Sequence, residues 1–116
     1  MSSEEKSYPV IVRRVEDIVI GPRRLTRYER ARIVAARALQ LALGAPPLID
    51  VEKLNTTDPV IIAMKELELG LPPIVIRRQK PSGGYQLIPL RILVEAEKEI
   101  SERRRGVLKE VFGYLA

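Results

Sequence analysis

The sequence contains neither cysteine nor histidine, and these two absences remove several kinds of chemistry at once. Without cysteine there is no disulfide and no thiolate nucleophile, and without histidine there is no imidazole for acid–base catalysis. A zinc site built from Cys and His ligands is excluded for the same reason. Only carboxylates, hydroxyls and lysines remain as catalytic groups. We therefore expect no catalytic residue, no cofactor site and no metal site in this chain.

Phosphate-binding glycine loops of the Walker and dinucleotide types are also missing. The acidic residues do not form a recognisable catalytic pair or metal site either. Glu95 and Glu99 are four residues apart on one helical face, but basic neighbours surround them, which favours a solvated lattice of ion pairs. Asp50, Glu52 and Asp58 lack the spacing of a calcium loop. We interpret them as loop and helix-capping residues.

Aromatic residues make up only 4% of the chain, so a core must be built from Val, Ile, Leu and Ala. No run of eighteen apolar residues predicts a transmembrane helix, and the N-terminus opens with acidic residues rather than a signal peptide. These features predict a cytoplasmic location. One asparagine and three glutamines beside abundant Arg, Glu, Ile and Val suggest a thermophilic source.

The net charge is +5, and its excess lies in the first long helix and around residues 77–80. Such a charge permits contact with nucleic acid without demanding it. The few aromatics are scattered and form no stacking platform, and no polar recognition helix follows a turn. A small basic nucleic-acid-binding protein of ribosomal or chromatin type stays open as the alternative function.

The first predicted helix runs from Thr26 to about Leu43. Thr26 and Glu29 form the T-x-x-E capping box, in which each side chain satisfies a backbone donor of the other residue. Gly44 supplies a left-handed C-cap and Pro46 prevents continuation. This segment therefore carries start and stop signals of its own.

Four arginines are distributed around this helix. At about 100° per residue, Arg30 and Arg37 fall on a polar side, Arg27 lies at its margin, and Arg32 lies within the apolar side. The apolar arc is alanine-rich, which would let another backbone approach closely, although alanines at helical spacing are more often internal packing. Its members are Tyr28, Ala31, Ala35, Ala38, Leu39 and Ala42.

A second helix is predicted from Asp58, a natural N-cap, and Pro59, a natural first residue, to Gly70. We expect Glu66 and Glu68 to be solvated. The residues expected to face the core are Val60, Ile61, Met64, Leu67 and Leu71.

The remaining segments complete a mainly α fold with a small β-hairpin, an α+β class. Residues 74–79 and 85–90 predict two strands joined by the glycine turn at 81–84. Residues 91–116 predict a helix that breaks or frays near 103–106, where Arg103 and Gly106 interrupt its apolar row. Short strands are considered at 9–12 and 18–20. The expected organisation is a tail at 1–20 that orders only beside a partner, a core at 21–92 and a helical extension at 93–116.

Three motifs carry a family resemblance across residues 20–90: LTRYERARIVAARALQLALGAP, TDPVIIAMKELELG and LPPIVIRRQKPSGGY. With these motifs in this order, the chain resembles the family of subunit K of archaeal DNA-directed RNA polymerase. That family is the counterpart of the bacterial omega subunit and of a small subunit shared by eukaryotic polymerases. The resemblance implies an omega-like fold and a non-catalytic subunit that clamps the largest polymerase subunit and aids its folding, assembly and stability.

The resemblance also implies that template DNA is reached only through the complex, with no membrane and no small-molecule substrate. Of the residues that it carries over, we single out Arg32, which we expect to pair with a carboxylate or carbonyl of the largest subunit. Arg77 and Arg78 point to opposite faces of a strand, so at most one faces the core. The expected partner-binding residues are Arg27, Tyr28, Arg30, Arg32, Ala35, Arg37, Leu39, Asp58, Pro59, Lys65, Arg77 and Arg78.

Overall fold

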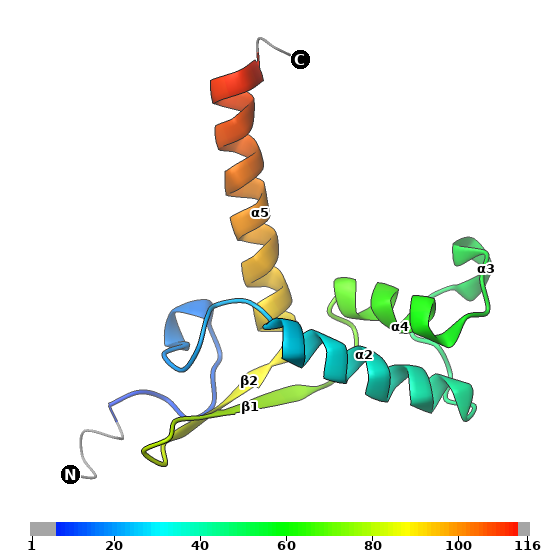
Figure 1. Cartoon of the computed structure of the whole chain (residues 1–116), viewed down its shortest axis with the longest axis horizontal. Coiled ribbons are helices and arrows are strands. Elements are labelled where there is room, and N and C mark those ends of the chain that lie inside the picture. The colour runs from blue at the N-terminus through cyan, green and yellow to red at the C-terminus, as the bar shows by residue number, and fades with distance from the viewer. Residues whose placement is uncertain (1–6, 114–116) are drawn as a thin grey trace.

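The computed structural model describes residues 7–113, which form a flat α+β molecule with extents of 54 × 50 × 20 Å (Figure 1). The long helix α2 crosses one side of a two-stranded hairpin, and α4 lies alongside α2. Helix α5 leaves the hairpin and projects away from the rest of the chain. The elements are η1 (Val15–Asp17), α2 (Arg27–Ala42), α3 (Val51–Leu54), α4 (Pro59–Glu68), β1 (Val75–Gln79), β2 (Tyr85–Pro89) and α5 (Leu90–Phe112).

The starts of α2 and α4 follow the predicted capping chemistry. Thr26 Oγ1 accepts a hydrogen bond from the Glu29 N–H at 3.1 Å, and Glu29 Oε1 accepts one from the Thr26 N–H at 2.8 Å. Asp58 accepts from the Val60 N–H at 2.9 Å, with Pro59 as the first residue of α4. After α2, Gly44 adopts a φ of +105°, as the predicted left-handed stop requires. Both helices are confirmed.

The hairpin is also confirmed, and its register determines which side chains are buried. β1 and β2 are antiparallel, with Arg78 opposite Gln86 and Ile76 opposite Ile88. All four of these side chains are buried, because alternate residues of a strand point to the same face. The inner face of the hairpin is therefore half apolar and half polar. This polar half becomes the centre of the network described below.

The hydrophobic core lies between the hairpin, the first turns of α5, the N-terminal segment and the inner sides of α2 and α4. It is built from aliphatic residues, as the shortage of aromatics predicted. Its members are Val12, Ile18, Leu25, Ile33, Leu67, Ile76, Ile88, Leu90, Ile92, Leu93 and Val94.

Residues 7–20 pack on the hairpin, where the sequence predicted a tail. The Val12 N–H donates to the Leu87 carbonyl at 2.9 Å, and the Leu87 N–H donates to the Val10 carbonyl at 2.7 Å. This contact forms a parallel bridge between Ile11 and Leu87, so one of the two considered strands exists in rudimentary form. Residues 18–20 form no strand; the N–H groups of Val19 and Ile20 donate to Gln86 instead. That this segment needs a partner to become ordered stays a prediction.

Gln86 is fully buried and makes four hydrogen bonds to this segment. Its Oε1 accepts from the N–H groups of Val19 and Ile20 at 3.0 and 3.1 Å. Its Nε2 donates to the carbonyls of Pro9 and Asp17 at 2.8 and 2.7 Å. A single amide therefore satisfies backbone groups on both sides of η1.

Replacing Gln86 by leucine should release residues 7–20 from the hairpin. Buried backbone groups left without partners cost about 1–3 kcal/mol each, so the segment should open before the rest of the chain unfolds. The measurement is amide hydrogen exchange at Val19 and Ile20, which we expect to accelerate at least tenfold. The exposed Gln79→Leu variant on the neighbouring strand is the control. Equal exchange in both variants would contradict this role of Gln86.

The predicted inner face of α4 is wrong in most positions. Ile62, Ala63, Glu66 and Leu67 are buried, and of the predicted set only Leu67 is among them. The others, Val60, Ile61, Met64 and Leu71, are 42–54% exposed. The helix is apolar on several sides, so periodicity alone did not decide which side packs inward. The decisive contact is an ion pair that places Glu66 inside, against the prediction that this residue is solvated.

The predicted break in the C-terminal helix is also wrong, because α5 continues through Arg103 and Gly106 to Phe112. Its described residues from Lys98 onward project into solvent, where side chains need not follow an apolar row. Arginine and glutamate favour helix in such positions. Across residues 7–113, no helix has the length and hydropathy needed to cross a membrane.

Candidate partner-binding surface

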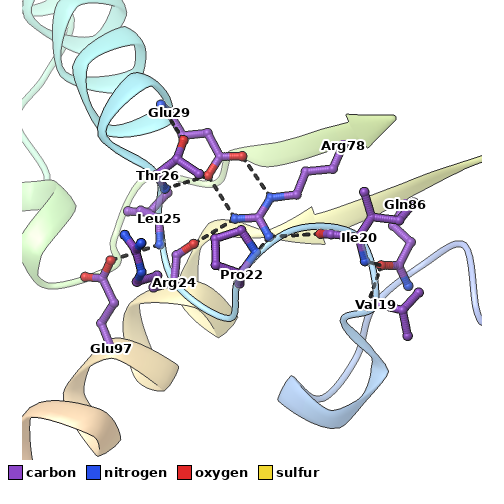
Figure 2. A network of polar contacts seen from close by, with 10 residues as sticks. All are labelled: Val19, Ile20, Pro22, Arg24, Leu25, Thr26, Glu29, Arg78, Gln86 and Glu97. Atoms are coloured by element: carbon purple, nitrogen blue, oxygen red, sulfur yellow. Dashed lines mark hydrogen bonds and ion pairs between the residues drawn. The ribbon is translucent and has the colours of Figure 1, made fainter. Parts of the chain in front are cut away.

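Arg78 is the centre of a polar network beneath the start of α2 (Figure 2). It reaches from β1 towards residues 20–29 and is only 7% exposed. Its Nε and Nη2 donate to the two carboxylate oxygens of Glu29, both at 2.9 Å. Its remaining N–H groups donate to the carbonyls of Ile20, Pro22 and Arg24. The planar guanidinium thus holds a helix N-terminus and the loop before it in one geometry.

Gly21 allows the loop to approach this guanidinium. Its φ is +78°, and a Cβ atom there would lie 2.9 Å from Arg78 Nη1. Both the backbone conformation and the contact therefore disfavour any other residue. The GPRR sequence at 21–24 is therefore a loop of defined geometry, held by Arg78.

Glu29 has a lowered pKa in the folded chain, because two opposing effects act on its carboxylate. Burial disfavours the ionised form, but hydrogen bonds from Arg78 and from the Thr26 N–H, together with the charge of Arg78, outweigh it. The pKa therefore falls below its ordinary value of 4.5. Ionised Glu29 serves both the helix cap and the ion pair.

Acidification should weaken the chain through this residue. Because the folded pKa of Glu29 is lowered, its contribution is fully present above about pH 4.5 and is lost as the pH falls through the folded value. The wild type should therefore lose stability on acidification more steeply than the Glu29→Gln variant. Urea unfolding of both proteins between pH 7 and pH 3 measures this difference. Parallel pH profiles would show that Glu29 ionisation contributes nothing.

A second buried ion pair joins α2 to α4. Arg37 donates to the two carboxylate oxygens of Glu66 at 2.5 and 3.2 Å, and Glu66 is 0% exposed. Glu66 also accepts from the Leu48 N–H at 2.8 Å, while Arg37 donates to the Pro46 carbonyl at 3.0 Å. The side of α2 predicted as polar therefore faces the rest of the molecule.

The opposite side of α2 is left open, together with the adjoining side of α4. Tyr28 and Leu39 are 83% and 62% exposed, and Val60 and Met64 of α4 are 47% and 54% exposed. A groove of about 580 Å³ runs between the two helices, with Ala31, Val34, Ala35, Ala38, Val60, Met64 and Leu67 along it. We call this surface the α2–α4 face, defined by Tyr28, Ala31, Ala35, Leu39, Val60 and Met64.

Several of the predicted partner-binding residues lie on this face or at its edge. Ala35, Tyr28 and Leu39 belong to it, and Arg27 lines the groove. Arg32 is exposed and lies on the same side of α2. Pro59 and Asp58 are at the start of α4, where Asp58 serves as its cap.

Other predicted residues are engaged within the chain. Arg37 and Arg78 are largely buried in the two ion pairs, and Arg30 donates to Glu97 at 2.8 Å. Arg77 is exposed and its guanidinium lies 4.5 Å from the centre of the Tyr85 ring. Lys65 pairs loosely with Glu68 at 3.7 Å. As predicted, only one of Arg77 and Arg78 faces the core.

Sequence reasoning missed three polar residues that organise the fold: Glu66, Gln86 and Glu97. Each binds groups far away in the chain, such as the Leu25 N–H, which donates to Glu97 at 2.9 Å. No local pattern indicates such contacts. One weak signal existed, since Gln86 occupies the inward position of a strand between apolar residues.

Comparison with known proteins identifies the family. The RNA polymerase Rpb6 family matches residues 20–74, which include α2, α4 and the loop that binds Arg78. The DNA-directed RNA polymerase subunit Rpo6 of Pyrobaculum aerophilum is 51% identical over 79 residues, covering 68% of this chain and 74% of that protein. That of Thermofilum pendens is 57% identical over 74 residues, covering 64% and 90%. The chain belongs to the RNA polymerase Rpb6 family.

Proposed function

We propose that this chain is a non-catalytic small subunit of an archaeal DNA-dependent RNA polymerase. In this role it clamps the largest polymerase subunit and promotes the folding, assembly and stability of that subunit during transcription. Relatives from Aeropyrum pernix and Pyrobaculum aerophilum bear the name of an RNA polymerase subunit, at 49% and 51% identity. The level of identity supports transfer of the subunit role, and the largest subunit as the direct contact is our inference.

The observation that carries this proposal is the open α2–α4 face. A contiguous patch of exposed apolar side chains marks an interaction site in a folded protein. Alanines at the centre of the face, among them Ala31 and Ala35, permit close approach of another backbone. Polar networks on the inner side of α2 keep the helix in place, so the outer side is presented in a fixed orientation.

Co-expression with the largest polymerase subunit tests the proposal. The chain should co-purify with that subunit and raise its yield in the soluble fraction. If the two proteins separate during gel filtration at moderate salt, the clamping role is wrong. The alternative, a nucleic-acid-binding protein, predicts steep loss of DNA binding with rising salt for the isolated chain. No aromatic platform supports that alternative in the described surface groove.

Arg32→Glu should weaken association with the largest subunit by at least about tenfold, because charge reversal places two like charges together at the expected contact. The side chain is exposed and forms no ion pair within residues 7–113, so the stability of the isolated chain should stay unchanged. Competition pull-down against wild type measures the loss. Arg13→Glu, an exposed reversal outside the face, is the control. Equal binding of both variants would remove Arg32 from the interface while leaving the family assignment intact.

A further inference from the structure

The distal half of α5, residues 98–112, presents an apolar row that nothing else in the described chain covers. Ile100, Val107 and Val111 are 43%, 58% and 52% exposed. They fall within about 40° of one another around the helix. The row continues the line of Leu93 and Ala96, which are buried in the core. The same side of the helix is therefore packed at its base and open beyond it.

Where this row meets α2, a cleft of about 440 Å³ is lined by arginines. Arg24, Arg27 and Arg104 line it and form no salt bridge within residues 7–113. Arg30 also lines it but is held by Glu97, whose carboxylate in addition accepts the Leu25 N–H. The only carboxylate lining the described cleft is thus already engaged, and the cleft keeps a strong positive charge.

The aliphatic row and the arginine cleft together limit which kind of molecule can bind here. A second copy bound through the same patch would bring arginines against arginines, since a two-fold contact uses identical surfaces. Nucleic acid would satisfy the arginines but would leave the aliphatic row without a partner, and the cleft offers no aromatic ring for stacking. An amphipathic helix with acidic flanks would satisfy both the row and the charges.

We propose that distal α5 and the arginine cleft at its base form a docking site for an acidic amphipathic helix of another protein. The aliphatic row packs against the apolar side of that helix, and Arg104, Arg27 and Arg24 bind its flanking carboxylates. This site shares Arg27 and Arg30 with the edge of the α2–α4 groove, but its aliphatic row lies on α5, and it goes beyond the proposed contact with the largest subunit.

The test uses the full chain and a synthetic helical peptide with leucines at helical spacing and glutamates beside them. Fluorescence anisotropy should show binding that is at least tenfold tighter than that of the same peptide with lysines in place of the glutamates. Polyglutamate, which lacks the apolar side, should bind at least tenfold more weakly. Arg104→Glu and Val107→Asp should each weaken peptide binding about tenfold. Lys109 lies about 180° from Ile100 around the helix. Lys109→Glu is therefore the matched control, and its peptide affinity should be within twofold of wild type.

Specific results would overturn the proposal. These are absence of peptide binding, equal binding of the glutamate and lysine peptides, or equal effects of Arg104→Glu and Lys109→Glu. Tighter binding of duplex DNA than of the peptide, lost in Arg104→Glu, would identify a nucleic-acid surface instead. A dimer in analytical ultracentrifugation that Val107→Asp dissociates would identify a second copy as the occupant. None of these measurements involves the largest polymerase subunit, so the outcome is independent of the proposed function.

Discussion

Replacement of Arg78 by alanine should lower the free energy of unfolding by about 3–5 kcal/mol, since it removes one partner of a buried ion pair. The loss leaves Glu29 without its countercharge and leaves the carbonyls of Ile20, Pro22 and Arg24 without donors. Arg78→Lys should recover little of this stability, because an ammonium group cannot reproduce the fork that contacts both carboxylate oxygens. Urea unfolding followed by circular dichroism measures the effect.

The neighbouring arginine supplies the matched control. Arg77 is on the same strand with its guanidinium over the Tyr85 ring, and it is exposed. Its replacement by alanine should cost only about 0.5–1 kcal/mol, the value of an exposed cation–π contact. If Arg77→Ala and Arg78→Ala are equally destabilising, the buried network does not contribute as its geometry indicates.

Glu66→Ala should be comparably damaging, by about 3–5 kcal/mol. The substitution leaves the guanidinium of Arg37 largely buried without its carboxylate and removes the acceptor of the Leu48 N–H. The connection between α2 and α4 should therefore loosen together with α4. Thermal unfolding and hydrogen exchange of the Leu48 amide measure both effects. Glu68→Ala, an exposed carboxylate two residues further along the helix, should change stability by less than about 1 kcal/mol.

The double variant Arg37→Met with Glu66→Leu tests whether the instability of Glu66→Ala comes from an uncompensated buried charge or from lost hydrogen bonds. Replacing both partners of a buried pair by apolar residues is often neutral or stabilising. We expect the double variant to be more stable than Glu66→Ala alone. A double variant as unstable as the single one would show that the hydrogen bonds to Pro46 and Leu48, rather than the uncompensated charge, dominate.

How far the fold follows from local sequence depends on the range of the interaction involved. Thr26 with Glu29, Asp58 with Pro59, and Gly44 each act within a few residues, and for that reason the helix boundaries were predictable. The hairpin followed from two short extended segments, 74–79 and 85–90, on either side of a glycine turn. The α+β class rests on these local signals.

Orientation was less predictable, because it depends on distant partners. Which side of α4 faces inward is decided by Arg37, which is 29 residues away from Glu66. Helix α4 is apolar on several sides, so its pattern did not distinguish the face that packs on α2 from the face left open. The same limit applies to the candidate site. The alanine arc of α2 was recognised from the sequence, but the contribution of Val60 and Met64 from α4 needed the structure.

The register of the hairpin has a consequence for the order of events during synthesis. Arg78 and Gln86 are cross-strand neighbours, and between them they bind backbone groups from Pro9 to Arg24 as well as Glu29. These groups are made first on the ribosome, yet their hydrogen-bond partners emerge 49 to 77 residues later. These hydrogen bonds therefore cannot form until Arg78 and Gln86 have both been translated and the hairpin has paired. A one-residue slip between the two strands would place Arg78 and Gln86 on opposite faces of the hairpin, so the N-terminal segment would lose one of its two anchors.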